Sequence, residues 1–346
     1  MGDFLLLDAH AFTIKRMTPH PTPPAILADV DTGIDDMLAL IYLCALHRTG
    51  AITLAGVSAN AGNTTATMAA NNTRYILNLM QCEDVPVALG AQAPLNVALT
   101  ITPETHGPAG LGYVLAPGNE HAQNLSVTAG VVPNAQVMQA LEEPSPLAPG
   151  IMNDAPKLWK QVLDTYPQCR LLISGPCTLA AKNMDLARAF SHITVMGGAV
   201  DYPGNTTEHA EWNFWSDADA AQALLSLNPT LLSLQISEQI TITAEELDLL
   251  ALPPKPHQVV AEALRFYFEF HQAMGEGYLA QVHDLAAAMI ACDTVSYSTT
   301  TCKLSMDPED RGAVIRGHGD DVDVVSSLEK ASVLEEFRRV CALLGT

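Results

Sequence analysis

Short apolar runs followed by helix-like stretches recur along the chain and predict an α/β protein. The apolar run over residues 25–30 has the length and composition of a buried strand, and residues 35–50 read as a helix that Gly50 closes. Residues 51–59 and 61–80 repeat this strand-then-helix order. We therefore expect a single α/β domain with a mostly parallel open sheet, helices on both faces, and a ligand site at the carboxyl ends of the strands.

Both ends of the chain and one central stretch depart from this pattern. Residues 1–24 end in a proline-rich segment and are interpreted as a lead-in, so the predicted domain covers residues 25–346. Residues 113–150 include a polar, proline-rich stretch, and we expect surface loops there. Residues 299–317 read as a β-hairpin, and residues 326–344 read as a closing amphipathic helix.

Composition and charge exclude several classes of protein. The 346 residues are 48% hydrophobic and 16% charged, which is typical of a folded domain with a substantial core. A formal net charge of −21 argues against nucleic acid as a partner, because phosphates would be repelled. No apolar run is long enough to cross a membrane, and the N-terminus does not resemble a signal peptide. Seven cysteines without CxxC spacing predict a reducing compartment, the cytoplasm.

The most distinctive chemistry lies between the first predicted strand and its helix. Asp29, Asp31, Asp35 and Asp36 fall within eight residues, and four like charges this close would resist compaction. A divalent cation removes that repulsion. Oxygen ligands with no cysteine or histidine nearby favour Ca²⁺ or Mg²⁺ over zinc. The simpler alternative is a solvated acidic turn in which Asp35 caps the helix, but that explains only one of the four carboxylates.

The stretch DVDTGIDD resembles the DxDPGxDD signature of the nucleoside hydrolases, the inosine–uridine-preferring N-ribohydrolase family. It departs from that signature at Val30 and at Thr32; the family usually has proline at the position of Thr32. The stretches AEWN and HD, which end at Asn213 and Asp284, are the other specific parts of the resemblance, and GPCTLA and HGPAGLG are weaker ones. The similarity covers roughly residues 25–320.

This resemblance implies a nucleoside hydrolase-like fold and hydrolysis of the N-glycosidic bond of ribonucleosides to free base and ribose, in nucleoside salvage or catabolism. It also implies a homodimer or homotetramer, and a calcium ion held by Asp31, Asp36, Asp284 and the backbone carbonyl of Thr178. Asp31 would act as the general base, and His283 would face the nucleobase and donate a proton or hydrogen bond to it. The residues that would bind the nucleoside are Asp35, Asn63, His106, Met196, Asn205, Glu211 and Asn213.

Two alternatives belong to other functional classes. A haloacid-dehalogenase-type phosphohydrolase also begins with a strand and DxD and would use Mg²⁺, although Gly33 stands where its signature has threonine or valine. A calcium- or sugar-binding protein without turnover is the non-enzyme alternative. The motifs do not decide between purine and pyrimidine nucleosides, because residues outside them set that preference.

Overall fold

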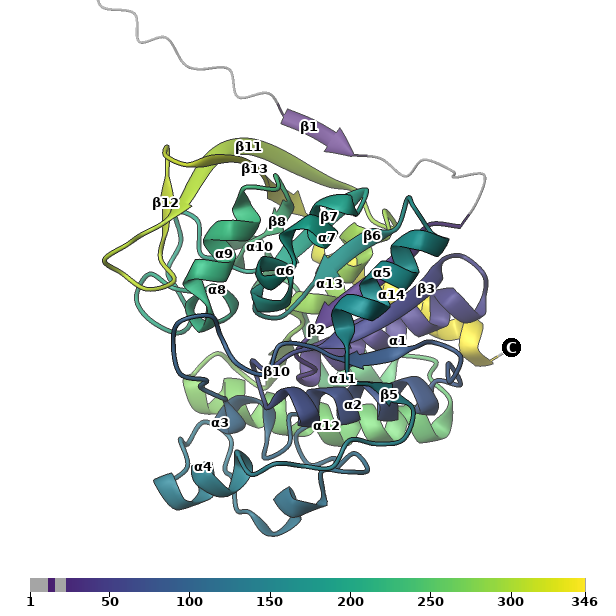
Figure 1. The fold of residues 1–346 in the computed structure, drawn as a ribbon. Coiled ribbons are helices and arrows are strands. Elements are labelled where there is room, and N and C mark those ends of the chain that lie inside the picture. Colours follow the sequence, from purple (N-terminus) through teal and green to yellow (C-terminus); the bar gives the residue numbers. More distant parts are fainter. Residues whose placement is uncertain (1–11, 16–22, 346) are drawn as a thin grey trace, which may run out of the picture.

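The centre of the fold is an 11-stranded sheet whose strand order is β1-β11-β13-β8-β7-β6-β2-β3-β4-β5, with β12 paired to β11 (Figure 1). The computed structural model describes residues 12–15 and 23–345, so most of the predicted lead-in lies outside the described residues. Neighbouring strands from β13 to β5 in this order pair in parallel, and β11 pairs antiparallel with β1, β12 and β13. The strands of the sheet are β1 (Phe12–Lys15), β2 (Ala25–Val30), β3 (Thr53–Ala59), β4 (Val87–Leu89), β5 (Ile151–Met152), β6 (Arg170–Ile173), β7 (His192–Met196), β8 (Thr230–Leu232), β11 (Tyr297–Met306), β12 (Val314–Arg316) and β13 (Asp320–Leu328), while β9 (Thr241–Thr243) and β10 (Leu279–Gln281) form a separate pair.

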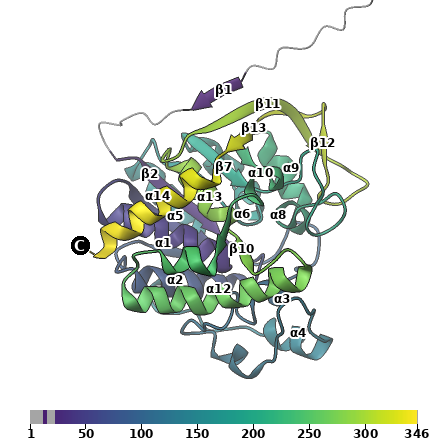
Figure 2. The same ribbon diagram turned by 180° about the vertical axis from the view of Figure 1, so that it is seen from behind.

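Helices cover both faces of the sheet, as predicted (Figures 1 and 2). One buried apolar cluster joins the sheet to α1, α2, α12, α13 and α14, and a second joins its other face to α5, α6, α7 and α9. Since both clusters share one sheet, the residues form a single domain. The helices are α1 (Ile34–Arg48), α2 (Ala66–Leu79), α3 (Pro103–His106), α4 (Ala135–Leu141), α5 (Ala155–Thr165), α6 (Thr178–Lys182), α7 (Met184–Ala189), α8 (Trp212–Ser216), α9 (Ala218–Leu225), α10 (Leu234–Ser237), α11 (Ala244–Asp248), α12 (Pro254–Met274), α13 (His283–Ala291) and α14 (Lys330–Ala342).

Helix α1 is buried on every side. Every residue from Ile34 to Leu46 is shielded from solvent, and the helix contacts α2, α12, α13 and α14. A helix that is apolar all round belongs in a core, and DMLALIYLCAL has that composition. The N-terminus of α1, which carries Asp35 and Asp36, is therefore held from several directions.

The C-terminal part contains one strand that the sequence pattern does not indicate. The predicted hairpin forms between β11 and β12, with Met306 opposite Val314, and the closing helix is α14. Between them, β13 pairs with β11 and joins the parallel strand β8. Within the lead-in, Phe12–Lys15 pairs with β11 and extends the sheet.

Among the helices that the structure describes, none combines the length and the apolar composition that a membrane-spanning helix needs.

Candidate active site

The polar residues singled out in the sequence follow the carboxyl ends of neighbouring parallel strands. Asp31 follows β2, Asn63 follows β3, Thr178 follows β6, and Met196 ends β7. Because these strands are adjacent in the order β7-β6-β2-β3, their ends meet at one edge of the sheet. Ligands bind at such edges in open α/β sheets.

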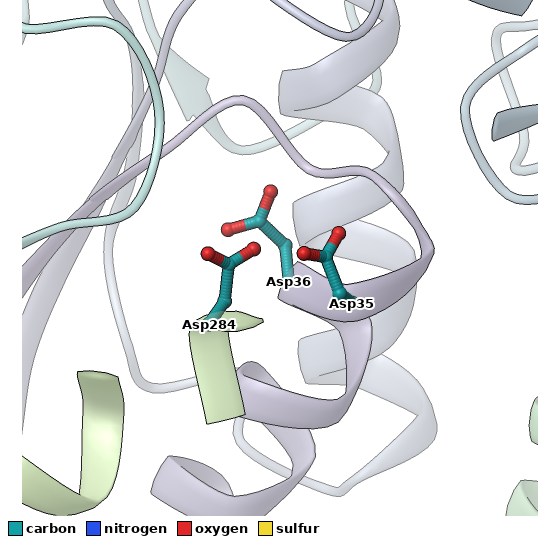
Figure 3. A group of neighbouring side chains, drawn as sticks. All are labelled: Asp35, Asp36 and Asp284. Carbon is teal, nitrogen blue, oxygen red and sulfur yellow. The ribbon is translucent and has the colours of Figure 1, made fainter. Parts of the chain in front are cut away.

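Three carboxylates converge at this edge and form a carboxylate cluster of Asp35, Asp36 and Asp284. Each offers an oxygen atom, and these atoms lie within 4.8 Å of one another. Figure 3 shows the three side chains turned toward one another, two from the first turn of α1 and one from the first turn of α13. Residues nearly 250 positions apart in sequence are thus brought together by the packing of α13 against α1.

Asp31 lies next to this cluster and is closely surrounded by backbone. Its Oδ2 accepts a hydrogen bond of 2.6 Å from the Asn63 N–H. A Cβ atom at Gly62 would lie 2.1 Å from the same oxygen, and one at Gly175 would lie 2.8 Å from Oδ1. Only glycine fits at position 62 without displacing the carboxylate. The chain therefore builds a tight backbone pocket around Asp31.

Burial raises the pKa of all four of these carboxyl groups, and repulsion between them adds to the effect for Asp31, Asp35 and Asp284. Burial raises the pKa of Asp35 to about 7, and the neighbouring charge of Asp36 adds to the effect. Burial, followed by the charges of nearby aspartates, raises the pKa values of Asp31 and Asp284 well above their usual range. Such a site resists ionisation unless a positive charge is present.

Three oxygens of these carboxyls accept no hydrogen bond among the described residues. They are the Oδ1 atoms of Asp31, Asp35 and Asp284, and all three are buried. Buried polar atoms are nearly always paired, so these three oxygens fit a site that binds a cation. All the ligand atoms are oxygens, which suits a hard divalent cation such as Ca²⁺ or Mg²⁺. Such a cation would pair with the unbonded oxygens and balance the negative charge of the carboxylates.

Two further side chains hold the expected cation ligands in place. Asp36 accepts hydrogen bonds from the Ser174 hydroxyl at 2.6 Å and the Gly33 N–H at 3.0 Å. The Thr178 hydroxyl donates to Asp217 at 2.7 Å. The proton of the Thr178 hydroxyl is therefore directed at Asp217, and the backbone carbonyl oxygen of Thr178 is the ligand atom that the resemblance implies.

His106 is buried, although it belongs to a glycine-rich loop. Its Nδ1 accepts a 3.1 Å hydrogen bond from the Ile34 N–H, one of the free donors at the start of α1. Its ring lies 5.4 Å from that of Tyr267 on α12. A Cβ atom at Gly33 would lie 2.7 Å from Nδ1 and 2.6 Å from the Asn63 amide nitrogen. His106, Asn63 and the aspartate turn are therefore in direct contact.

His283 begins α13 directly before Asp284 and is also buried. Its Nδ1 lies 2.9 Å from the Ser237 hydroxyl. Burial lowers its pKa to about 3, and nearby His271 adds to the effect. The imidazole is therefore neutral near pH 7, so its remaining function toward a ligand is to donate or accept a hydrogen bond.

Among the residues expected to bind the sugar, Asn213 is buried and uses only its side-chain NH₂ group as a donor. It donates to the carbonyls of Ser174 at 2.8 Å and Met196 at 3.1 Å, which leaves its side-chain oxygen as an acceptor. Glu211 is buried and caps α8, accepting from three backbone N–H groups, so less of its acceptor capacity is free. Asn205 is the one predicted site residue that is exposed, and its oxygen accepts from the Trp212 N–H.

Several residues that shape the site have no signal in the predicted motifs. Ser174 directly follows β6, so the strand-end rule would have identified it. Asp217 reads as a helix cap and is one, but it also accepts from Thr178 and the Leu95 N–H. Ser237 lies in LQISEQ, where the family pattern is not kept, and only the structure places it beside His283.

Comparisons of the sequence with known proteins and protein families identify nucleoside hydrolases. The model of the inosine-uridine preferring nucleoside hydrolase family matches residues 26–337. The pyrimidine-specific ribonucleoside hydrolase RihA of Shewanella baltica is 32% identical over 267 residues, which cover 75% of this chain and 74% of that protein.

Solved structures agree on the fold. A plant nucleoside hydrolase, PpNRh1, has a TM-score of 0.74 at 20% identity, with 92% of this chain and 99% of that chain covered. The purine-preferring ribonucleoside hydrolase of Gardnerella vaginalis has a TM-score of 0.74 at 21% identity, with 93% and 99% covered. These likenesses confirm the predicted single α/β domain with a mostly parallel sheet.

Proposed function

Because the chain belongs to the inosine-uridine preferring nucleoside hydrolase family and is an enzyme that cleaves ribonucleosides, we propose that it is a calcium-dependent hydrolase of pyrimidine ribonucleosides. The observation that carries the metal requirement is the carboxylate cluster, with its buried oxygens that lack partners among the described residues. The pyrimidine preference follows the name of the Shewanella relative. The direct test is release of free ribose from uridine in the presence of calcium. Family membership removes the phosphohydrolase and non-catalytic alternatives.

The proposed ligands of calcium are Asp36 and Asp284 of the carboxylate cluster, together with Asp31 and the carbonyl oxygen of Thr178. Asp35, the third member of the cluster, is assigned to the ribose. When bound, the cation supplies positive charge that lowers the pKa values of the surrounding carboxyls and of nearby water. Calcium acidifies water less than zinc does, so a carboxylate base is still required. Asp31 fits that role, because one of its oxygens is held by the Asn63 N–H and the other accepts no bond among the described residues.

In the proposed reaction, water attacks C1′ of the ribose as the bond to the nucleobase breaks. Asp31 accepts the proton of the attacking water, while the ribosyl group passes through a transition state with oxocarbenium character, as in glycoside hydrolysis. Asp35 and Asn213 accept hydrogen bonds from the ribose 2′- and 3′-hydroxyls. His283 donates a hydrogen bond to the departing base. The base then takes up a proton from water, and Asp31 returns the proton that it accepted to solvent, so the products are neutral base and ribose.

The products are free base and ribose, which suits nucleoside salvage or catabolism. All seven cysteines are free thiols in the structure, in keeping with the proposed location in the cytoplasm. A homodimer or homotetramer stays a prediction of the resemblance, which sedimentation of the purified protein would test.

Calcium should stabilise the protein more at about pH 8 than at about pH 5. The pKa of Asp35 is raised from 3.8 to about 7, so in the window between these two values the metal-free native state holds a proton that the unfolded chain has released. The metal-free protein therefore loses stability as pH rises through the window. Calcium displaces that proton, so the melting temperature should rise on calcium addition, and more at the higher pH. No calcium-dependent shift at either pH would contradict the metal site.

His283→Ala should slow uridine hydrolysis by at least ~10²-fold while scarcely affecting a p-nitrophenyl riboside. A nucleobase leaves poorly as an anion and needs a donor, whereas p-nitrophenolate leaves without one. Ser237→Ala removes only the hydroxyl beside Nδ1, so we expect a smaller loss with the same substrate dependence. Equal losses of kcat on both substrates would show that His283 shapes the sugar site and does not assist the leaving group.

A further inference from the structure

We propose that Asn72 and Thr73 of α2 are positioning residues that hold the turn carrying Asp31, an inference that rests on the proposed function. The turn contains an unusual backbone position. Thr32, the residue after Asp31, is fully buried and has a φ of 24°. This region is unfavourable for a β-branched residue, and such conformations persist only where the surroundings hold them.

The carbonyl and the hydroxyl of Thr32 are hydrogen-bonded to consecutive residues of α2. The Asn72 side-chain amide donates to the Thr32 carbonyl at 3.3 Å. The hydroxyls of Thr32 and Thr73 lie 2.6 Å apart and share a hydrogen bond. Asn72 and Thr73 are themselves fully buried, so water does not compete for these contacts. The proline that the family usually has at this position could not adopt this φ, because its ring fixes φ near −65°. In this chain the hydrogen bonds from α2 restrain the turn instead.

Asn72 also links this turn to the loop that follows His106. Its amide nitrogen donates to the Ala109 carbonyl at 2.7 Å. The loop lies so close that a Cβ at Gly110 would be 3.0 Å from the same nitrogen and 3.1 Å from the Thr32 carbonyl oxygen. One side chain thus joins the turn that supplies the proposed base to the loop that supplies His106.

Asn71, the preceding residue, has the same chemistry but points its bonds away from the site. It donates to the Asn119 side chain at 2.9 Å and the Pro146 carbonyl at 3.0 Å, and it accepts from the Ala148 N–H. These partners belong to residues 113–150, and one of them, Asn119, also donates to the Asn72 side-chain oxygen at 2.9 Å, but Asn71 itself bonds neither Thr32 nor the loop after His106. The chain therefore provides a matched control, since Asn71 and Asn72 are both buried amides in the same turn of α2.

The experiment compares Asn72→Leu with Asn71→Leu, which remove the hydrogen bonds without adding charge. Both should lower the melting temperature. Asn72→Leu should also weaken calcium binding by about 10-fold in a calorimetric titration and lower kcat on uridine by about 10²-fold, because small misplacements of catalytic groups have effects of this size. Asn71→Leu should leave both values within about threefold of the wild type, because it removes no bond to Thr32 or Ala109 and reaches Asn72 only indirectly, through Asn119.

Equal effects of the two variants on calcium affinity and kcat would overturn the positioning role. If Asn72→Leu does not fold, Thr73→Val removes only a hydroxyl and should still lower kcat about 10-fold; wild-type kcat in that variant would also overturn the proposal. Wild-type protein that neither binds calcium nor releases ribose would instead contradict the proposed function, so the two failures are distinguishable.

Discussion

Asp31→Asn should lower kcat for uridine by roughly 10²–10⁴, the range expected when a general base is lost. The asparagine oxygen can still act as a metal ligand, but it cannot accept the proton of the attacking water. The space around Asp31 is tight, but asparagine has the same size, so it fits between the glycines at 62 and 175. With its oxygen toward the metal, its NH₂ group replaces the oxygen that accepts from the Asn63 N–H, so one hydrogen bond is lost. The protein should still fold, and it should keep a calcium-dependent rise in melting temperature.

Asp29→Asn is the matched control for this variant. Asp29 belongs to the same motif and is equally buried, but its carboxyl accepts a hydrogen bond from the Ser58 hydroxyl, which in turn accepts from the Trp159 indole. Burial raises the pKa of Asp29 to about 7, so the neutral amide is a close substitute for it. We expect a loss of less than about 10-fold in kcat. Turnover near the wild-type value in Asp31→Asn would place the base elsewhere.

Removal of the ribose 2′-hydroxyl should reduce kcat/KM by around 10⁴ when 2′-deoxyuridine is compared with uridine. Asp35 and Asn213 are buried acceptors that would be left without partners, and polar sites reject such analogues strongly. 5′-Deoxyuridine provides the control. The family resemblance implies that Asn205 and Glu211 bind the 5′-hydroxyl. Asn205 is exposed and Glu211 already accepts three backbone N–H groups, so loss of the 5′-hydroxyl should have a smaller effect. Comparable kcat/KM for uridine and 2′-deoxyuridine would contradict the assignment of the ribose diol site.

The features that the sequence predicts well are those with a local signal. The strand over residues 25–30, the helix that follows it, and the helix start at His283 each show in a short window of apolar periodicity and turn residues. The sheet order is not local. Strand β13 begins with Asp320, Asp321 and Asp323, and these charges interrupt the apolar pattern by which a strand is recognised. The structure shows that it pairs with β11 and β8.

The candidate site shows the same division. Motif spacing identifies Asp31, Asp36 and Asp284, but it cannot show that Asp35 lies within 4.8 Å of the last two. The partners that hold them come from distant segments. Ser174 reaches Asp36 across 138 positions, and Ser237 lies 46 positions before His283. Such contacts depend on how the helices pack, which a periodic pattern in one segment does not encode.

Calcium-dependent ribonucleoside hydrolysis is tested most directly by measuring free ribose released from uridine by the purified protein. The assay is run on protein stripped of metal by a chelator, before and after calcium is restored, with inosine as the second substrate. We expect no turnover without the metal, recovery of turnover with calcium, and faster hydrolysis of uridine than of inosine. Full release of ribose from uridine by protein that contains no metal would contradict the proposed mechanism.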